Sequence, residues 1–340
     1  MIAGTPKKIK IGMSSCQTPV NVSASDLSEN HEAIINWVLA TISWTVAPLA
    51  ILLNALVIIA VTQRKELQKH SNILLSSIAL SDMLTGIASI PAVTTKTLIA
   101  HQSSSELMCA INRDAMNLEG IFVTCSLYNL TVVAWERFVA VRKWMDYKVI
   151  VTKRRLFKIS IIAWLSAILT RLPLYITVVT SGDTKVKYIW TTILNVCVIA
   201  NVVTIVYFYA MIYHGVRNHR TSDLKNVNAL AQARLESRVA KTTALITAAL
   251  LLTIAVSGIL VMTMRLKFPT SRPTLAIEIS RTLLRLNSVF NPVLYCFKDL
   301  RFRKAVLELL KITKTQAAQK TGPNVQFRQQ KNQHCLPGNV

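Results

Sequence analysis

The sequence IINWVLATISWTVAPLAILLNALVIIAV occupies residues 34–61 and contains no charged side chain. As a helix it is long enough to cross about 30 Å of hydrocarbon. Two further uncharged runs, 188–213 and 242–264, are also long enough to cross a bilayer. Only a helix or a closed barrel satisfies its backbone groups in lipid. The chain is therefore predicted to be a helical integral membrane protein.

Four other apolar stretches each carry isolated charges, and they bring the number of predicted spans to seven. The charges are Asp82, Glu119, Arg171 and, in the least apolar stretch, Glu278, Arg281 and Arg285. We expect an all-α bundle of seven transmembrane helices with spans at about 34–61, 72–98, 108–141, 157–180, 188–214, 239–264 and 274–297.

The composition agrees with a membrane protein. The 340 residues are 52% hydrophobic and 16% charged, and the mean hydropathy is +0.40. The net charge of +23 suggests nucleic acid at first, but the basic residues lie between apolar runs rather than on a soluble scaffold. We therefore expect no nucleic-acid partner. The six cysteines show no CxxC pair or metal-ligand spacing.

The distribution of basic residues predicts the orientation. If the N-terminus is outside, the inner segments 63–70, 142–158, 215–241 and 298–340 hold 25 of the 39 Lys and Arg, and the outer segments hold eight. The positive-inside rule therefore places the N-terminus outside. The basic inner segments would also attract anionic membrane lipids, although the charge is equally explained by topology alone.

The two ends of the chain are predicted to lie outside the bundle. Residues 1–33 form an extracellular segment with a glycosylation pattern at Asn21, and its start lacks the apolar core of a cleavable signal peptide. Residues 298–311 have the helical periodicity of an amphipathic helix lying on the inner leaflet. The polar residues 312–340 are expected to be a disordered cytoplasmic tail.

Polar motifs on five spans suggest a family. They are Asn54 in the first span, Leu80 and Asp82 in the second, Glu136-Arg137-Phe138 ending the third, Trp164 in the fourth and Asn291-Pro292-Val293-Leu294-Tyr295 in the seventh. Together they resemble the rhodopsin-like (class A) G-protein-coupled receptors over residues 30–311. The resemblance implies a plasma-membrane receptor, not an enzyme, that binds an extracellular ligand in the outer half of the bundle and activates a heterotrimeric G protein.

A polar cluster around Asp82 is one site that the resemblance implies. Similar receptors gather such oxygens around a hydrated sodium ion that favours the inactive state, and the matching residues here are Asp82, Ser126, Asn287, Ser288 and Asn291. Oxygen ligands with one carboxylate suit a small cation. The alternative is a hydrogen-bonded cluster that joins the helices without an ion. No other cofactor is expected.

A second set of residues resembles the family's activation switch. In similar receptors the arginine matching Arg137 is held by its acidic neighbour and by an acid below the sixth helix, then released to meet the G protein. The matching residues are Glu136, Arg137, Tyr209, Glu236, Pro292 and Tyr295. The alternative is that Glu136 and Arg137 are only interfacial residues that extend toward water.

Glu119 has two interpretations. It lies about five helical turns outward of Arg137, where similar aminergic receptors carry the aspartate that binds a ligand amine. Arg285 on the seventh span could instead satisfy this carboxylate in an internal salt bridge. Arg281, one turn further out, would then be available for an acidic group of the ligand.

The sequence also departs from the family pattern. The outer loop 181–187 has no cysteine, so the only clearly extracellular candidate partner for Cys109 is Cys16. The sixth span has Ile254 and Val256 where the family has tryptophan and proline, and Asn201 replaces the proline of the fifth. Because Val256 cannot kink the helix as proline does, we expect the outward movement of the sixth helix to differ from the standard one in size or hinge.

Other functions fit the sequence less well. A retinal-binding photoreceptor needs a lysine in 274–297, and none is present. A transporter or channel commonly shows internal repeats or broken helices, which we do not find. An intramembrane enzyme needs a base at depth, yet all six histidines fall in loops, tails or span ends. A decoy receptor that does not signal stays open, as does the identity of the ligand.

Overall fold

The computed structural model describes residues 26–68, 70–101, 105–143, 145–180, 183–219, 247–248, 251–256, 258–259, 273–298 and 302–309. The main helices are α1 (Asp26–Gln63), α2 (His70–His101), α3 (Glu106–Arg142), α5 (Lys153–Thr180), α6 (Thr184–His219) and α8 (Pro273–Lys298). Two short helices, η1 (Lys65–Leu67) and α4 (Tyr147–Ile150), lie in connections. Residues 302–309 are also helical.

Five of the described helices are long and apolar enough to cross a membrane, namely α1, α2, α3, α5 and α6. They correspond to the first five predicted spans. The seventh predicted span is α8, whose charges at Glu278, Arg281 and Arg285 place it outside a purely hydropathic definition. Most of the sixth predicted span lies outside the described residues, and only short pieces between 247 and 259 are described as helical.

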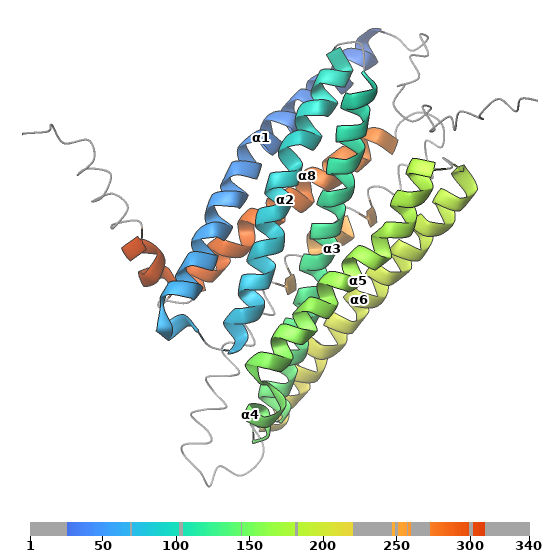
Figure 1. The fold of residues 1–340 in the computed structure, drawn as a ribbon. Helices are drawn as coiled ribbons and strands as arrows, with labels where there is room; N and C mark the ends of the chain where they lie inside the picture. The colour runs from blue at the N-terminus through green and yellow to red at the C-terminus, as the bar shows by residue number, and fades with distance from the viewer. Residues whose placement is uncertain are drawn as a thin grey trace, which may run out of the picture.

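The long helices run side by side, and α3 lies between the two groups of helices seen in Figure 1. On one side α2 packs against α1 and α3, and α8 packs against α1 and α2. On the other side α5 and α6 pack against α3 and against each other. We call the end where α1 begins the N-terminal end, and the opposite end, which holds η1 and α4, the basic end.

Apolar side chains fill the bundle toward the basic end. Leu74 and Ile78 of α2, Leu130 of α3, Leu156 of α5 and Ile205 of α6 belong to one buried cluster. Many large apolar side chains on the outer faces of the helices are exposed, including Leu52, Ile162, Leu169 and Val203. Exposure on this scale is the arrangement expected where lipid rather than water covers the helices.

Two segments contain helix outside the predicted spans. The first helix begins at Asp26, before the predicted span 34–61, because Asp26 and its acidic neighbours end the apolar run without breaking the helix. Negative side chains are in fact favourable in the first turns of a helix. The basic inner segment 142–158, for which no helix was predicted, contains α4, which places Tyr147 beneath α3.

The predicted amphipathic helix is present over residues 302–309, beside the basic end of α1 (Figure 1). Phe302 and Ala305 are buried against apolar side chains of α1, among them Val57 and Ala60. Arg303 and Lys304 are exposed on its other face. An ion pair of 2.8 Å between Arg64 and Glu308 also links this helix to the first connection.

Candidate functional sites in the bundle

Glu119 and Arg285 form a buried salt bridge between α3 and α8. Nε of Arg285 lies 2.5 Å from Oε1 of Glu119, and Nη2 lies 3.0 Å from Oε2. The side chains are only 6% and 4% exposed, respectively. This two-point contact uses the fork of the guanidinium against both carboxylate oxygens, which is the strongest geometry for such a pair. Of the two interpretations of Glu119, the structure contains the internal pair.

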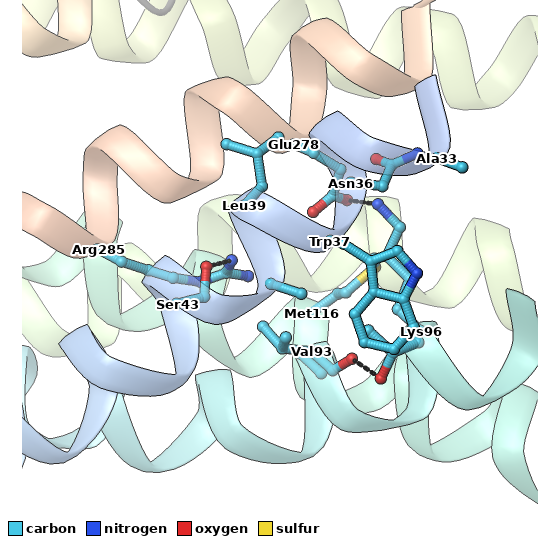
Figure 2. A pocket seen from close by; sticks show the side chains of 13 residues that line it. Ala33, Asn36, Trp37, Leu39, Ser43, Val93, Lys96, Met116, Glu278 and Arg285 are labelled. Atoms are coloured by element: carbon cyan, nitrogen blue, oxygen red, sulfur yellow. Dashed lines mark hydrogen bonds and ion pairs between the residues drawn. The ribbon is translucent and has the colours of Figure 1, made fainter. Parts of the chain in front are cut away.

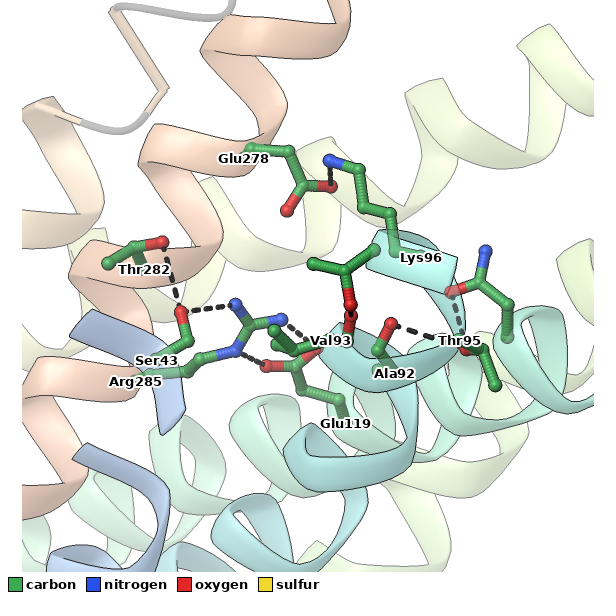
Figure 3. Close-up of polar contacts among 11 residues, drawn as sticks. Ser43, Ala92, Val93, Thr95, Lys96, Glu119, Glu278, Thr282 and Arg285 are labelled. Atoms are coloured by element: carbon green, nitrogen blue, oxygen red, sulfur yellow. Dashed lines mark hydrogen bonds and ion pairs between the residues drawn. The ribbon is translucent and has the colours of Figure 1, made fainter. Parts of the chain in front are cut away.

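Hydroxyl groups from two further helices complete this pair. Ser89 of α2 donates to Oε1 of Glu119 at 3.0 Å. Nη1 of Arg285 donates to Ser43 of α1 at 3.0 Å (Figure 3). Ser43 also lies 3.5 Å from the hydroxyl of Thr282. The charges therefore join four helices at one depth. Because both carboxylate oxygens accept from Arg285, Glu119 has little capacity left for a ligand amine.

A cavity of about 290 Å³ opens beside this pair, between α1, α2, α3 and α8 (Figure 2). Its lining includes Trp37, Ser43, Val93, Lys96, Glu278 and Arg285. Lys96 and Glu278 form a second ion pair, with 2.8 Å between Nζ and Oε1, nearer the N-terminal end. A cavity of this size lies at the lower end of the range for small-molecule sites, and its polar groups converge as such sites require.

Two other arginines, Arg171 and Arg281, lie near this depth. The sequence identified Arg171 only as a charge within a predicted span. Arg171 of α5 points toward α3, where its Nε donates to Thr124 at 3.1 Å and its guanidinium lies against Gly120. Arg281 of α8 has a buried Nη1 atom without a hydrogen-bond partner. Arg281, predicted to meet a ligand, is not among the residues that line the cavity.

The predicted polar cluster at Asp82 is largely brought together. Nδ2 of Asn291 donates to Oδ2 of Asp82 at 2.8 Å, and the hydroxyl of Ser288 donates to Oδ1 at 3.3 Å. Ser126 of α3 is buried and within reach of the same carboxylate. Asn287 does not join them, because its amide hydrogen bonds to Thr253 of the sixth predicted span. Four of the five predicted oxygen-bearing residues therefore surround one site.

The remaining family motifs join helices through hydrogen bonds. Asn54 of α1 donates to the carbonyl of Ser288 at 2.8 Å. Trp164 of α5 donates to Ser77 of α2 at 3.1 Å. The hydroxyl of Ser160 lies 2.7 Å from that of Ser77 and 3.0 Å from Oδ1 of Asn129 of α3. Buried hydrogen bonds of this kind hold transmembrane helices together, where hydrophobicity alone does not. Leu80, by contrast, is exposed.

At the basic end, Glu136 holds Arg137. Nε of Arg137 lies 2.6 Å from Oε2 of Glu136, and the side chains are 8% and 1% exposed, respectively. The hydroxyl of Tyr147, on α4, donates to the other carboxylate oxygen, Oε1, at 2.5 Å. Residues this deeply buried are not extending into water, so the structure does not contain the simple interfacial arrangement. The contribution of Tyr147 was not foreseen, because it depends on the unpredicted helix α4.

Polar side chains also link α6 to its neighbours. The hydroxyl of Tyr209 lies 3.0 Å from that of Thr247 in the sixth predicted span. Asn201, which replaces the family's proline, accepts a hydrogen bond of 2.5 Å from Thr131 of α3. An asparagine can therefore provide a contact between helices where the family pattern has a kink. Pro292 is buried within α8.

Several predicted residues lie outside what the structure describes. They are Cys16, Asn21, Glu236 and the side chain of Tyr295. Cys109 is disulfide-bonded. Its pairing with Cys16 stays a prediction, as do the glycosylation of Asn21 and the roles of Glu236 and Tyr295.

The helices and buried charges define a multi-pass membrane protein with a polar interior. The model of the family described as 7 transmembrane receptor (rhodopsin family) matches residues 53–295. This match covers more than half of the chain, so the chain belongs to the rhodopsin family of seven-transmembrane receptors. The predicted seven-helix fold class is thereby confirmed.

The chain is also similar to individual receptors. It is 31% identical to Octopamine receptor beta-1R of Drosophila melanogaster over 37% of this chain and 24% of that receptor. It is 30% identical to Alpha-2B adrenergic receptor of Talpa europaea over 35% and 30%, respectively. It is 22% identical to Rhodopsin, GQ-coupled of Mizuhopecten yessoensis over 76% and 56%. The matches thus span between about a quarter and just over half of these relatives.

Proposed function

We propose that this chain is a plasma-membrane receptor that binds an extracellular ligand in the outer half of its bundle and activates a heterotrimeric G protein. In this proposal the N-terminal end of the bundle is outside the cell and the basic end is inside. The membership of the receptor family supports it. The excess of Lys and Arg in the segments at the basic end supports the orientation.

The observation that carries the proposal is the buried pair of Glu136 and Arg137 at the basic end of α3. Arg137 is held by Glu136, and Tyr147 of the loop helix α4 in turn holds Glu136, so the arginine can be exchanged between two sets of partners. Such an exchange is a two-state element that a partner entering at this end would bias. We expect a G protein to be that partner.

Replacing Arg137 with Ala is expected to abolish G-protein activation. The measurement is GTPγS binding to a panel of purified heterotrimers by the receptor in nanodiscs, without added ligand and with a library of candidate ligands. Arg142→Ala is the matched control, because Arg142 is an exposed arginine of the last turn of the same helix. Equal activation by the Arg137→Ala variant and the parent would contradict the proposed role.

For the ligand site, we propose the cavity between α1, α2, α3 and α8. Arg285, which Glu119 holds, lines this cavity, and the ion pair of Lys96 and Glu278 lies nearer its mouth. Because Glu119 is engaged by Arg285, we expect it to position Arg285 rather than to bind an amine. Arg281, one turn outward on α8, is a further candidate for contact with an acidic group.

We also propose that a sodium ion binds at Asp82. The carboxylate, with the oxygens of Ser126, Ser288 and Asn291 nearby, supplies the hard oxygen ligands that a small cation prefers. Asn287 is not included, since its amide is directed to Thr253.

Sodium is therefore expected to raise the thermal midpoint of the receptor. A ligand at about 100 times its dissociation constant stabilises a protein by about 2.7 kcal/mol. The measurement compares sodium with choline at equal ionic strength, for the parent chain and for Asp82→Asn, which keeps the side-chain shape. The control variant is Ser160→Ala, which alters another polar network. Asn129→Asp is unsuitable as a control because it would add a charge. A sodium effect that persists in Asp82→Asn would rule out this site.

A further inference from the structure

The charges in the N-terminal half of the bundle do not balance. Four cations lie there on α2, α5 and α8, namely Lys96, Arg171, Arg281 and Arg285. Two of these cations are paired with carboxylates: Lys96 with Glu278, and Arg285 with Glu119. Arg171 and Arg281 have no carboxylate partner among the described residues. A charge at membrane depth is costly, so two arginines without carboxylates need an explanation.

Other acidic residues do not supply the missing partners. Asp114 is engaged by Arg113 and Tyr175 near the beginning of α3. The acids of α1 end at Glu32, eleven residues or about 16 Å before Ser43. Among the described residues, no carboxylate forms an ion pair with Arg171 or Arg281. The segments 1–25, 181–182 and 260–272, which the structure does not describe, contain no Asp or Glu.

The guanidinium of Arg171 occupies a position beside α3 that is open only because residue 120 is a glycine. Its guanidinium lies so close to Gly120 that a methyl group there would be 2.6 Å from Nη1. Nε donates to Thr124, and no carboxylate of the described residues forms an ion pair with the guanidinium. Gly120 directly follows Glu119, so Arg171 approaches the same turn of α3 that Arg285 approaches from α8.

Arg281 faces the same region from α8. It is one turn from Arg285, and its Nη1 atom is buried without a hydrogen-bond partner. Arg285 is paired with Glu119, which directly precedes the Gly120 that the guanidinium of Arg171 approaches. Two like charges that converge in a polar interior are relieved by one anion, and arginine is the side chain best suited to bind carboxylate or phosphate oxygens.

We propose that Arg171 and Arg281 form an anion site in the bundle interior, and that the ligand of this receptor carries a carboxylate or a phosphate. This inference deepens the proposed function and rests on it for the assignment of a ligand. The charge proposed for this ligand is opposite to that of an amine. Glu119, the acidic residue that could attract an amine, is already neutralised by Arg285. The oxyanion would lie between Arg171 of α5 and Arg281 of α8, neither of which lines the cavity that Arg285 lines.

The first test needs no ligand. If the two arginines are held ready for an absent anion, Arg171→Gln and Arg281→Gln should leave the thermal midpoint of the ligand-free receptor in nanodiscs unchanged or higher. Glu119→Gln should lower it, because that substitution leaves Arg285 unpaired. A fall in Arg171→Gln as large as in Glu119→Gln would overturn the proposal, since Arg171 would then be a structural residue.

The second test uses pairs of probes that differ in charge. We expect indole-3-propionate and dodecanoate to raise the thermal midpoint of the parent chain, while tryptamine and dodecylamine do not. Phenyl phosphate distinguishes a preference for phosphate from one for carboxylate. Both Gln variants should lose at least tenfold in the apparent affinity for the stabilising anion. Arg113→Gln, which removes a cation engaged by Asp114, should lose none.

Gly120→Ala gives an independent variant that keeps both charges. The added methyl group would displace the guanidinium of Arg171, so the anion should bind more weakly although no arginine is removed. Stabilisation by amines instead of anions, by neither arm, or equally in all variants would overturn the proposal. Because no G protein is present in these measurements, their outcome is independent of the test made with Arg137→Ala.

Discussion

Glu119→Gln is expected to destabilise the receptor by about 3–5 kcal/mol, the usual cost of removing one partner of a buried ion pair. The substitution leaves the guanidinium of Arg285 without its carboxylate at a position that is 4% exposed. Ser43 and the glutamine oxygen would still accept hydrogen bonds, but neither carries a compensating charge. The measurement is unfolding in a denaturing detergent followed by tryptophan fluorescence.

A double variant and a matched control separate the charge effect from simple loss of packing. Glu119→Gln with Arg285→Gln should be less destabilised than the sum of the two single changes, because no lone buried charge remains. Glu278→Gln is the control, since Glu278 pairs with the more exposed Lys96 and should lose no more than about 1 kcal/mol. Additive losses in the double variant would mean that the two side chains do not act as a pair.

Glu136→Gln is expected to raise ligand-independent G-protein activation about tenfold. The reason is that the carboxylate holds Arg137 at 2.6 Å in a buried position, and a neutral amide holds it less strongly. A tenfold change corresponds to about 1.4 kcal/mol in the equilibrium between two states. Tyr147→Phe should raise it about twofold to threefold by removing one hydrogen bond to Glu136. GTPγS binding measures both.

The increase should depend on Arg137. Adding Arg137→Ala to Glu136→Gln is expected to return activation to background, whereas Glu308→Gln should have no effect. Glu308 is a suitable control because it makes an ion pair with Arg64 at the same end of the bundle. Its side chain is 56% exposed, and it belongs to the helix over 302–309 rather than to α3. An unchanged or lower activity of Glu136→Gln would show that the pair does not restrain the receptor.

The polar motifs predicted which residues would meet better than how they would meet. Asp82, Ser288 and Asn291 were expected together and are joined by hydrogen bonds. Asn287 was expected with them but is directed to Thr253. Motif spacing gives the depth of a residue and an approximate face. Whether a side chain at the edge of that face turns to one neighbouring helix or another depends on small rotations that the sequence does not reveal.

The contacts missed by sequence reasoning involve helices whose relative rotation was unknown. Arg171 was noted only as a charge that weakened a span, and its approach to Gly120 depends on how α5 packs on α3. Tyr147 was unrecognised because a helix of four residues has little periodicity to detect. A single arginine in an otherwise apolar run was nevertheless a usable signal, since such a charge rarely faces lipid.

The sequence by itself determined that this chain crosses a membrane as helices, because uncharged runs of that length must satisfy their backbone groups internally in lipid. It also determined which ionisable groups lie at depth, since rise per residue converts position in a span into depth. Only the tertiary structure decided that Glu119 is matched by Arg285 and Arg171 by no carboxylate of the described chain. Pairing depends on which faces of different helices meet, and the packing of the whole bundle sets that.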